Sequence, residues 1–141
     1  MIDKYSSFKI GDSAVQSKTI TEKDIEQFAE LIGDYNPIHL DEEFAKKTRF
    51  KGKIAHGVLA IGLISSVLGN QLPGPGTIYL SQTVKFLRPV RPGDTINACA
   101  KIVDIESSKR IITLKTDCYN QREECILEGE AKVLFDKITN E

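Results

Sequence analysis

The chain has 141 residues, of which 40% are hydrophobic and 28% are charged, with a formal net charge of -1. These values are ordinary for a globular protein, and the length suits one domain with one hydrophobic core. Both charge signs are mixed along the sequence, which argues against nucleic-acid binding through a basic face and against a polybasic membrane contact.

Cysteine usage and the first residues bear on the cellular compartment. The three cysteines, Cys99, Cys118 and Cys125, are odd in number, and residues 1–5 lack a charged start followed by an apolar run. We therefore expect no signal peptide, and free thiols in a reducing cytoplasm. No CxxC or His-x-x-x-His pair indicates a metal site, and nothing in the sequence calls for a cofactor.

The first part of the chain predicts one strand and two short helices. Residues 14–20 suit a strand. Thr21 then resembles a helix N-cap with Asp24 as its capping-box partner, and apolar residues follow at helical spacing until Gly33, a natural stop. Residues 41–47 predict a second helix, because an aspartate precedes two glutamates in its first turn.

A basic loop and a long apolar segment come next. The loop 49–53 carries three cations and is either a solvated loop or a contact for an anionic substrate, such as a phosphate-bearing thioester. Residues 56–69 predict a helix that is buried on every side, since it is apolar all round. It is too short and too polar to span a bilayer. Gly57 within it allows close approach of backbone or ligand.

From residue 77 the apolar period changes to two. The apolar residues 78, 80, 84 and 86 are expected to share one face of a strand, and further strands are predicted over 96–102, 112–118 and 125–135. Long strands joined by short polar turns predict an antiparallel meander. Helices early and strands late predict an α+β fold, with the sheet wrapped around the apolar helix.

The heptapeptide 33–39, Gly-Asp-Tyr-Asn-Pro-Ile-His, places an acid and an imidazole on stiff backbone. Pro37 fixes its own φ and pushes Asn36 out of the helical region, which breaks any continuous helix between Asp34 and His39. A carboxylate and a neutral imidazole held close together can both hydrogen-bond to one water molecule and transfer its proton. We therefore expect Asp34 and His39 to form a water-handling acid/base pair.

This heptapeptide, followed by Ala45 and by Ile-Ala-His-Gly at 54–57, resembles the hydratase motif of MaoC-like proteins, and most of all that of the (R)-specific enoyl-CoA hydratases. The similarity covers nearly the whole chain, including residues 86–94. It implies a single hot-dog domain over residues 1–141. It also implies a homodimer with an acyl-thioester tunnel at the junction, and a CoA or acyl-carrier-protein thioester as the substrate.

The resemblance also implies roles for individual residues. Asp34 and His39 match the catalytic pair, and Gly57 matches the residue whose backbone N–H binds the thioester oxygen. Asn36 and Ser65 match positions that shape or support the site.

Two further positions are interpreted from their place in the predicted helix. His56 is interpreted as a supporting polar group at the helix start. Leu68, close to one helical turn beyond Ser65, is expected to line the acyl slot.

The predicted function is the reversible hydration of a trans-2-enoyl-CoA to the (R)-3-hydroxyacyl-CoA. As water attacks Cβ, charge builds on the thioester oxygen, and a backbone donor at a helix start stabilises it. We expect Asp34 to be the base on water, while the division of acid and base roles stays open. The alternatives are a 3-hydroxyacyl-carrier-protein dehydratase, an acyl-CoA thioesterase and a non-catalytic thioester-binding subunit, because a fold does not fix a function.

Overall fold

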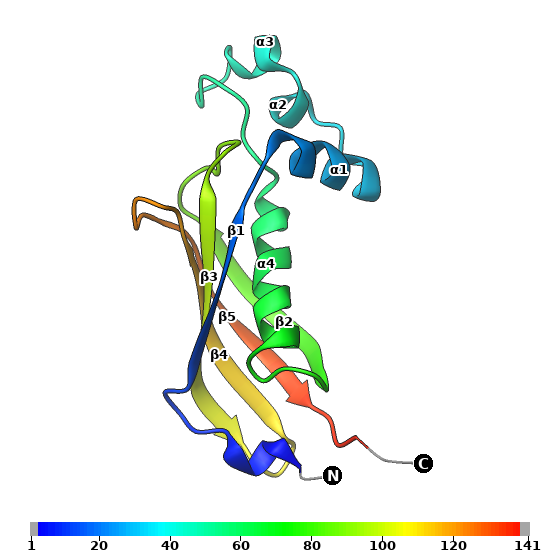
Figure 1. The fold of residues 1–141 in the computed structure, drawn as a ribbon, viewed down its shortest axis with the longest axis vertical. Coiled ribbons are helices and arrows are strands. Elements are labelled where there is room, and N and C mark those ends of the chain that lie inside the picture. Colours follow the sequence, from blue (N-terminus) through cyan, green and yellow to red (C-terminus); the bar gives the residue numbers. More distant parts are fainter. Residues whose placement is uncertain (1–2, 139–141) are drawn as a thin grey trace.

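The structure is a computed structural model that describes residues 3–138. It has one twisted sheet, a long helix lying along it, shorter α-helices at one end and a 3-10 helix at the other end (Figure 1). The elements in chain order are the 3-10 helix η1 (Lys4–Ser7), β1 (Ser13–Thr19), α1 (Glu22–Ile32), α2 (Pro37–Leu40), α3 (Glu42–Ala45), α4 (Gly57–Asn70), β2 (Thr77–Phe86), β3 (Thr95–Glu106), β4 (Ile111–Tyr119) and β5 (Cys125–Phe135). Across residues 3–138, no helix is both long and apolar enough to cross a bilayer.

Helix α1 begins and ends where the sequence predicts, and α3 begins there but ends at Ala45, short of the predicted residue 47. The Thr21 hydroxyl accepts a hydrogen bond from the Asp24 N–H at 3.0 Å, and the Asp24 carboxylate accepts one from the Thr21 N–H at 2.9 Å, which makes the capping box of α1. Gly33 ends α1 in the left-handed region, at a φ of 74°. Asp41 caps α3 through the N–H of Glu43.

The sheet has five antiparallel strands in the order β1-β3-β4-β5-β2. The predicted meander is confirmed for β3, β4 and β5, which follow one another in sequence and in space. Strand β2 does not pair with β3, its neighbour in sequence, but with β5, from Thr77 opposite Phe135 to Phe86 opposite Leu127. Strands β1 and β2 are therefore the two edges of the sheet.

The face that β2 turns to the helix differs from the prediction for residues 78–86. The pairing of β2 with β5 is irregular between Tyr79 and Ser81. Such a bulge inserts one residue and reverses the alternation of side chains along a strand. Tyr79 accordingly packs against the core, whereas Ile78 and Leu80 are 44% and 50% exposed. The expectation of one shared apolar face is wrong at these two positions.

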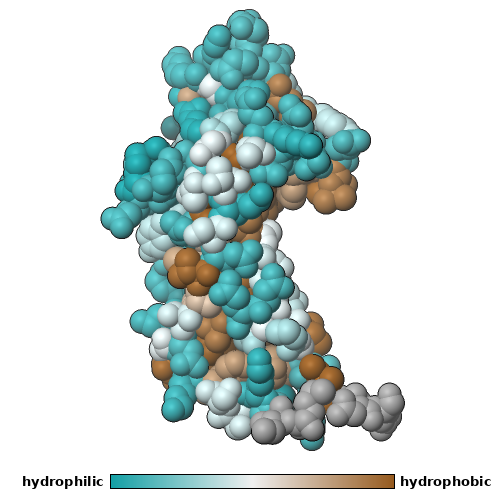
Figure 2. Space-filling view, viewed as in Figure 1, coloured by the Kyte–Doolittle hydropathy of each residue, from teal (hydrophilic) through white to brown (hydrophobic). Residues whose placement is uncertain are grey.

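Helix α4 is the centre of the core, but it is covered on one side only. It packs against strands β1, β2, β3 and β4. Its residues Ile64, Val67 and Leu68 are buried, whereas Val58 is 49% exposed and Ser65 is exposed. In the same view, Figure 2 shows the outline hollowed beside α4, below the short helices. The predicted all-round burial is therefore wrong for a single chain.

An antiparallel sheet wrapped around one long apolar helix is the α+β hot-dog arrangement that the sequence predicts. The three cysteines are free thiols, also as predicted. Burial raises the pKa of Cys118 to about 12, which suits a packing residue rather than a reactive thiol.

Candidate active site

The acid and the imidazole are presented by a turn and a single helical turn that follow α1. The Asp34 carboxylate accepts a hydrogen bond from the Asn36 N–H at 3.2 Å. The Asn36 side-chain oxygen accepts one from the Ile38 N–H at 3.2 Å, and Pro37 occupies the start of α2, the helix that carries His39. Sequence reasoning placed a backbone break here and missed α2, although an Asn cap before a Pro at the first helical position is a known start signal.

His39 is held as a neutral imidazole with one nitrogen free to accept. Its Nδ1–H donates to the Ile54 carbonyl oxygen at 2.7 Å. In the neutral ring, Nε2 then carries the lone pair. Burial lowers the pKa of His39 below its ordinary value, and the neighbouring His56 acts in the same direction, against the opposing effects of the Ile54 hydrogen bond and the Asp34 charge. The ring is therefore neutral at neutral pH.

His56 connects the two candidate catalytic residues. Its ring is 2% exposed and is stacked on the ring of His39, with centroids 3.8 Å apart and an interplanar angle of 30°. Its Nε2–H donates to the backbone carbonyl of Asp34 at 3.2 Å, and the edge-on ring of Phe28 packs against it with centroids 5.1 Å apart. His56 therefore contacts both residues: it is hydrogen-bonded to the backbone of Asp34 and stacked on the ring of His39.

The spacing of these groups allows one water to contact more than one of them. A carboxylate oxygen of Asp34 and ring nitrogens of His39 and His56 all lie within 4.8 Å of one another. A water making two hydrogen bonds of about 2.8 Å spans roughly 4.4–4.9 Å between its partners. A shared metal ion fits less well, because an imidazole binds a metal in its ring plane, and one of two stacked rings would have to turn out of the stack.

The groups open into a cleft of about 560 Å³, a volume typical of small-molecule sites. Asp34, His39, His56 and Gly57 form its polar end. The rest of its lining comprises Arg49, Phe50, Ile54, Ala55, Val58, Ala60, Phe86, Leu87, Arg88, Pro89, Val90, Ile126 and Leu127. Because the first N–H groups of a helix have no partner within it, the N–H of Gly57 at the start of α4 is available to a ligand, with the positive end of the helix dipole behind it.

Arg91 holds the loop that runs along this cleft. Its guanidinium donates to the carbonyl oxygens of Phe50, Gly52 and Lys53 at 2.5, 3.2 and 3.5 Å. The same loop continues into Ile54, whose carbonyl accepts from His39. Sequence reasoning missed Arg91, because nothing in its Arg-Pro-Gly-Asp turn points to carbonyl groups some forty residues earlier.

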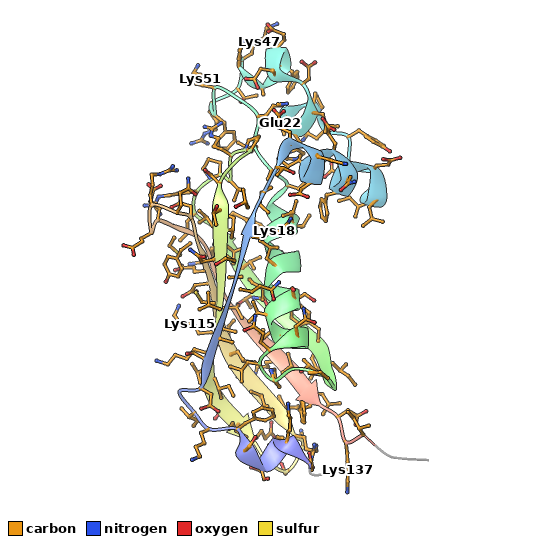
Figure 3. The ribbon with its side chains drawn as sticks, viewed as in Figure 1. Lys18, Glu22, Lys47, Lys51, Lys115 and Lys137 are labelled. Atoms are coloured by element: carbon orange, nitrogen blue, oxygen red, sulfur yellow. The ribbon has the colours of Figure 1, made fainter. Side chains whose placement is uncertain are left out.

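The cations of the predicted basic loop have different surroundings, and only one of them lines the cleft. Lys53 forms an ion pair with Glu22 at 2.9 Å and so has a structural partner. Lys51 lies on the outside of the loop, at the upper end of the molecule (Figure 3). Arg49 lines the cleft, together with Arg88 from the segment after β2. An anionic substrate would therefore meet these two arginines and not the whole charge run.

Three predicted site residues do not line the cleft of the single chain. Asn36 is exposed in the turn before α2, where its side chain caps that helix. Ser65 is on the uncovered side of α4, and Leu68 is 1% exposed within the core between α4 and the sheet. Neither lines the cleft that contains Asp34 and His39. Their supporting and acyl-binding roles stay predictions.

Known proteins resemble this chain over most of its length. An (R)-specific enoyl-CoA hydratase of Rhodospirillum rubrum is 45% identical over 130 residues, which are 92% of this chain and 90% of the relative. A 3-hydroxybutyryl-CoA dehydratase of Methylorubrum extorquens is 41% identical over 133 residues, which are 94% of this chain and 84% of the relative. The similarity therefore includes both the site segment and the sheet.

Solved structures agree with these relatives. An unliganded R-hydratase from Pseudomonas aeruginosa superposes with a TM-score of 0.89 and 38% identity, covering 95% of this chain and 86% of the other. An (R)-hydratase from Aeromonas caviae, involved in PHA biosynthesis, gives a TM-score of 0.89 and 39% identity, covering 92% of this chain and 98% of the other. The model of the MaoC like domain matches residues 8–122, while the expected domain bounds of 1–141 extend past the described residues and stay a prediction. The acid–imidazole segment, the hot-dog sheet and these matches agree, and the chain belongs to the MaoC-like family.

Proposed function

We propose that this protein is an (R)-specific enoyl-CoA hydratase, which adds water reversibly to a trans-2-enoyl-CoA to give the (R)-3-hydroxyacyl-CoA. The observation that carries the proposal is the placement of Asp34 and His39 within one water's reach, in a cleft that also contains the start of α4. The names of the relatives support the substrate class. The same catalyst dehydrates 3-hydroxyacyl thioesters in the reverse direction.

The contacts of each group suggest how the reaction proceeds. The N–H of Gly57 binds the thioester oxygen, where charge develops, and losing one such donor typically costs about 3 kcal/mol in barrier height. Water lies between the Asp34 carboxylate and Nε2 of His39, and its oxygen forms the bond to Cβ. His39 has no proton to give from Nε2 while its ring is neutral and its Nδ1–H is bound to Ile54. The group that takes a proton from the water can then give it to Cα, so the hydroxyl and the proton of one water are both added to the double bond.

We also propose that the active unit is a homodimer. Helix α4 leaves Val58, Gly62 and Ser65 along one exposed stripe, and the edge strand β2 exposes Ile78 and Leu80. An uncovered helix face with small side chains, exposed apolar residues and a free strand edge are features that a second copy covers. A tunnel for the acyl chain at that junction would place Ser65 near the substrate. The free thiols support a cytoplasmic location.

Hydration of crotonyl-CoA by the purified protein, followed by the loss of enoyl absorbance and by chiral analysis of the product, tests the proposal. Asp34→Asn and His39→Gln are expected to lower kcat by about 10²–10⁴-fold, the usual share of general acid–base catalysis. Asp104→Asn, which changes an exposed acid on β3 outside the cleft, is the matched control and keeps the wild-type rate.

Three results contradict the proposal. They are a wild-type rate in Asp34→Asn, a purely (S)-hydroxy product, and release of free CoA thiol with no 3-hydroxyacyl-CoA formed. The last of these identifies a thioesterase. Running the matching carrier-protein thioester beside crotonyl-CoA separates the hydratase from a carrier-protein dehydratase.

A further inference from the structure

The aromatic ring of Phe86 lies directly against Gly57 at the head of α4. A methyl group built on Gly57 would lie 2.8 Å from Cε1 of Phe86 and 3.1 Å from its Cδ1 and Cζ. These separations are shorter than an ordinary contact between carbon atoms. The ring therefore occupies the space that a side chain at position 57 would need, and it packs on the residue that begins α4 and lines the cleft.

Phe86 is a wall of the cleft and not a member of the core. It is 55% exposed and lines the cleft beside Leu87. Its backbone is fixed, because it is the last residue of β2, opposite Leu127 of β5, and the next N–H donates to the Ile126 carbonyl at 2.8 Å. The backbone therefore keeps the base of the side chain beside Gly57, and the ring adjusts only through its own side-chain torsions.

We propose that Phe86 is a specificity-determining residue, which restricts the bulk on the carbon next to the thioester carbonyl and so favours unbranched over 2-methyl-branched enoyl thioesters. This inference rests on the proposed function. An oxygen bound to the Gly57 N–H brings the carbonyl carbon within about 4 Å of that nitrogen. The substituents of this carbon then lie alongside the ring that covers Gly57.

Only one of those substituents varies between substrates. The sulfur is the same in every thioester, whereas Cα carries a hydrogen in an unbranched enoyl group and a methyl group in a 2-methyl-branched one. Excluding or admitting one methyl group in an apolar pocket changes kcat/KM by about 10–200-fold. The ring of Phe86 is expected to account for a discrimination of this size.

The test compares the kcat/KM of crotonyl-CoA and of trans-2-methylcrotonyl-CoA for the wild type, Phe86→Leu and Phe86→Ala. The α-methyl group also alters intrinsic reactivity, so the quantity measured is the change in preference between variants. Phe86→Ala is expected to reduce the preference for crotonyl-CoA at least tenfold, chiefly through faster turnover of the branched substrate. The preference of Phe86→Leu is expected to lie between those of the wild type and Phe86→Ala. Phe44→Ala removes an aromatic ring that is 46% exposed on α3, outside the cleft, and keeps the wild-type preference.

An unchanged preference in Phe86→Ala with crotonyl hydration retained overturns the inference. Loss of both activities in both variants, with a native circular dichroism spectrum, overturns it as well, because the ring would then hold the catalytic groups and not select the substrate. Crotonyl hydration by the wild type is the separate test of the proposed function. A failure of the proposed function would therefore be distinguishable from a failure of Phe86 to discriminate between the two substrates.

Discussion

Replacement of Arg91 tests whether a side chain outside the acid–imidazole segment sets the geometry of the site. Arg91 donates to the Phe50 and Gly52 carbonyls at 2.5 and 3.2 Å, and to that of Lys53 at 3.5 Å, the limit of a hydrogen bond. A hydrogen bond from a charged donor contributes about 1.5–3 kcal/mol, so two good ones at the lower end of that range contribute about 3 kcal/mol. Arg91→Ala is expected to lose about this much free energy of unfolding. Arg91→Lys, without the planar fork, is expected to lose about half.

The same substitution is expected to slow the reaction. The loop that Arg91 holds leads into Ile54, whose carbonyl fixes the tautomer and orientation of His39. A misplacement of about 1 Å at a catalytic group costs up to about 10²-fold, so Arg91→Ala is expected to lower kcat by 10- to 100-fold, with a smaller change in KM.

Urea unfolding followed by far-ultraviolet circular dichroism measures the stability, and crotonyl-CoA hydration measures the rate. Arg122→Ala is the matched control, because it removes an exposed guanidinium whose ion pair with Glu124 lies on the surface. It is expected to stay close to the wild type in both assays. A wild-type unfolding midpoint together with a wild-type kcat in Arg91→Ala would refute the reasoning.

Two other predictions follow from the structure. Because the folded-state pKa of His39 is lowered, the unfolded chain binds its proton at a higher pH, so stability falls as the pH drops below the ordinary histidine value. Urea midpoints between about pH 5 and 8 are expected to show this loss in the wild type and a smaller one in His39→Gln, and equal slopes in the two would contradict it. Gly129→Ala would place Cβ 2.0 Å from the Thr83 backbone carbonyl, which no side-chain rotation relieves, and it is expected to cost about 3 kcal/mol or more by forcing β2 away from β5. Gly69→Ala, with nothing within 4 Å, is its control, and similar midpoints in the two variants would disprove the close approach of the strands.

Local signals made much of the fold predictable. The Thr21 capping box, the Asp41 cap and the apolar run of α4 depend on neighbours a few residues away, and the structure has each of them where the sequence predicts. The position of β2 beside β5 and the bulge at Leu80 depend on pairing partners about fifty residues away, which no local pattern encodes. The side of α4 that a single chain leaves open was missed because composition alone does not reveal which neighbours a helix has.

The candidate site divides in the same way. The heptapeptide that contains Asp34 and His39 was readable because its proline and its two functional side chains lie close in sequence. The carbonyl that orients His39, the arginine that holds that loop and the ring that covers Gly57 were not readable, since each joins segments that meet only in the folded chain.

The polar end of the cleft comes from one short span, residues 34–57, and the opposite wall comes from the distant ends of β2 and β5. Closing a short loop costs little chain entropy, so the reactive groups are brought together mainly by local chain geometry, with Arg91 as the tie from the distant segment. Substitutions at the strand ends can then change which acyl groups the enzyme accepts without replacing the groups that carry out the reaction. A library randomised at the exposed positions 86 and 87 should consequently be a productive source of catalysts with altered acyl ranges and an unaltered stereochemical outcome.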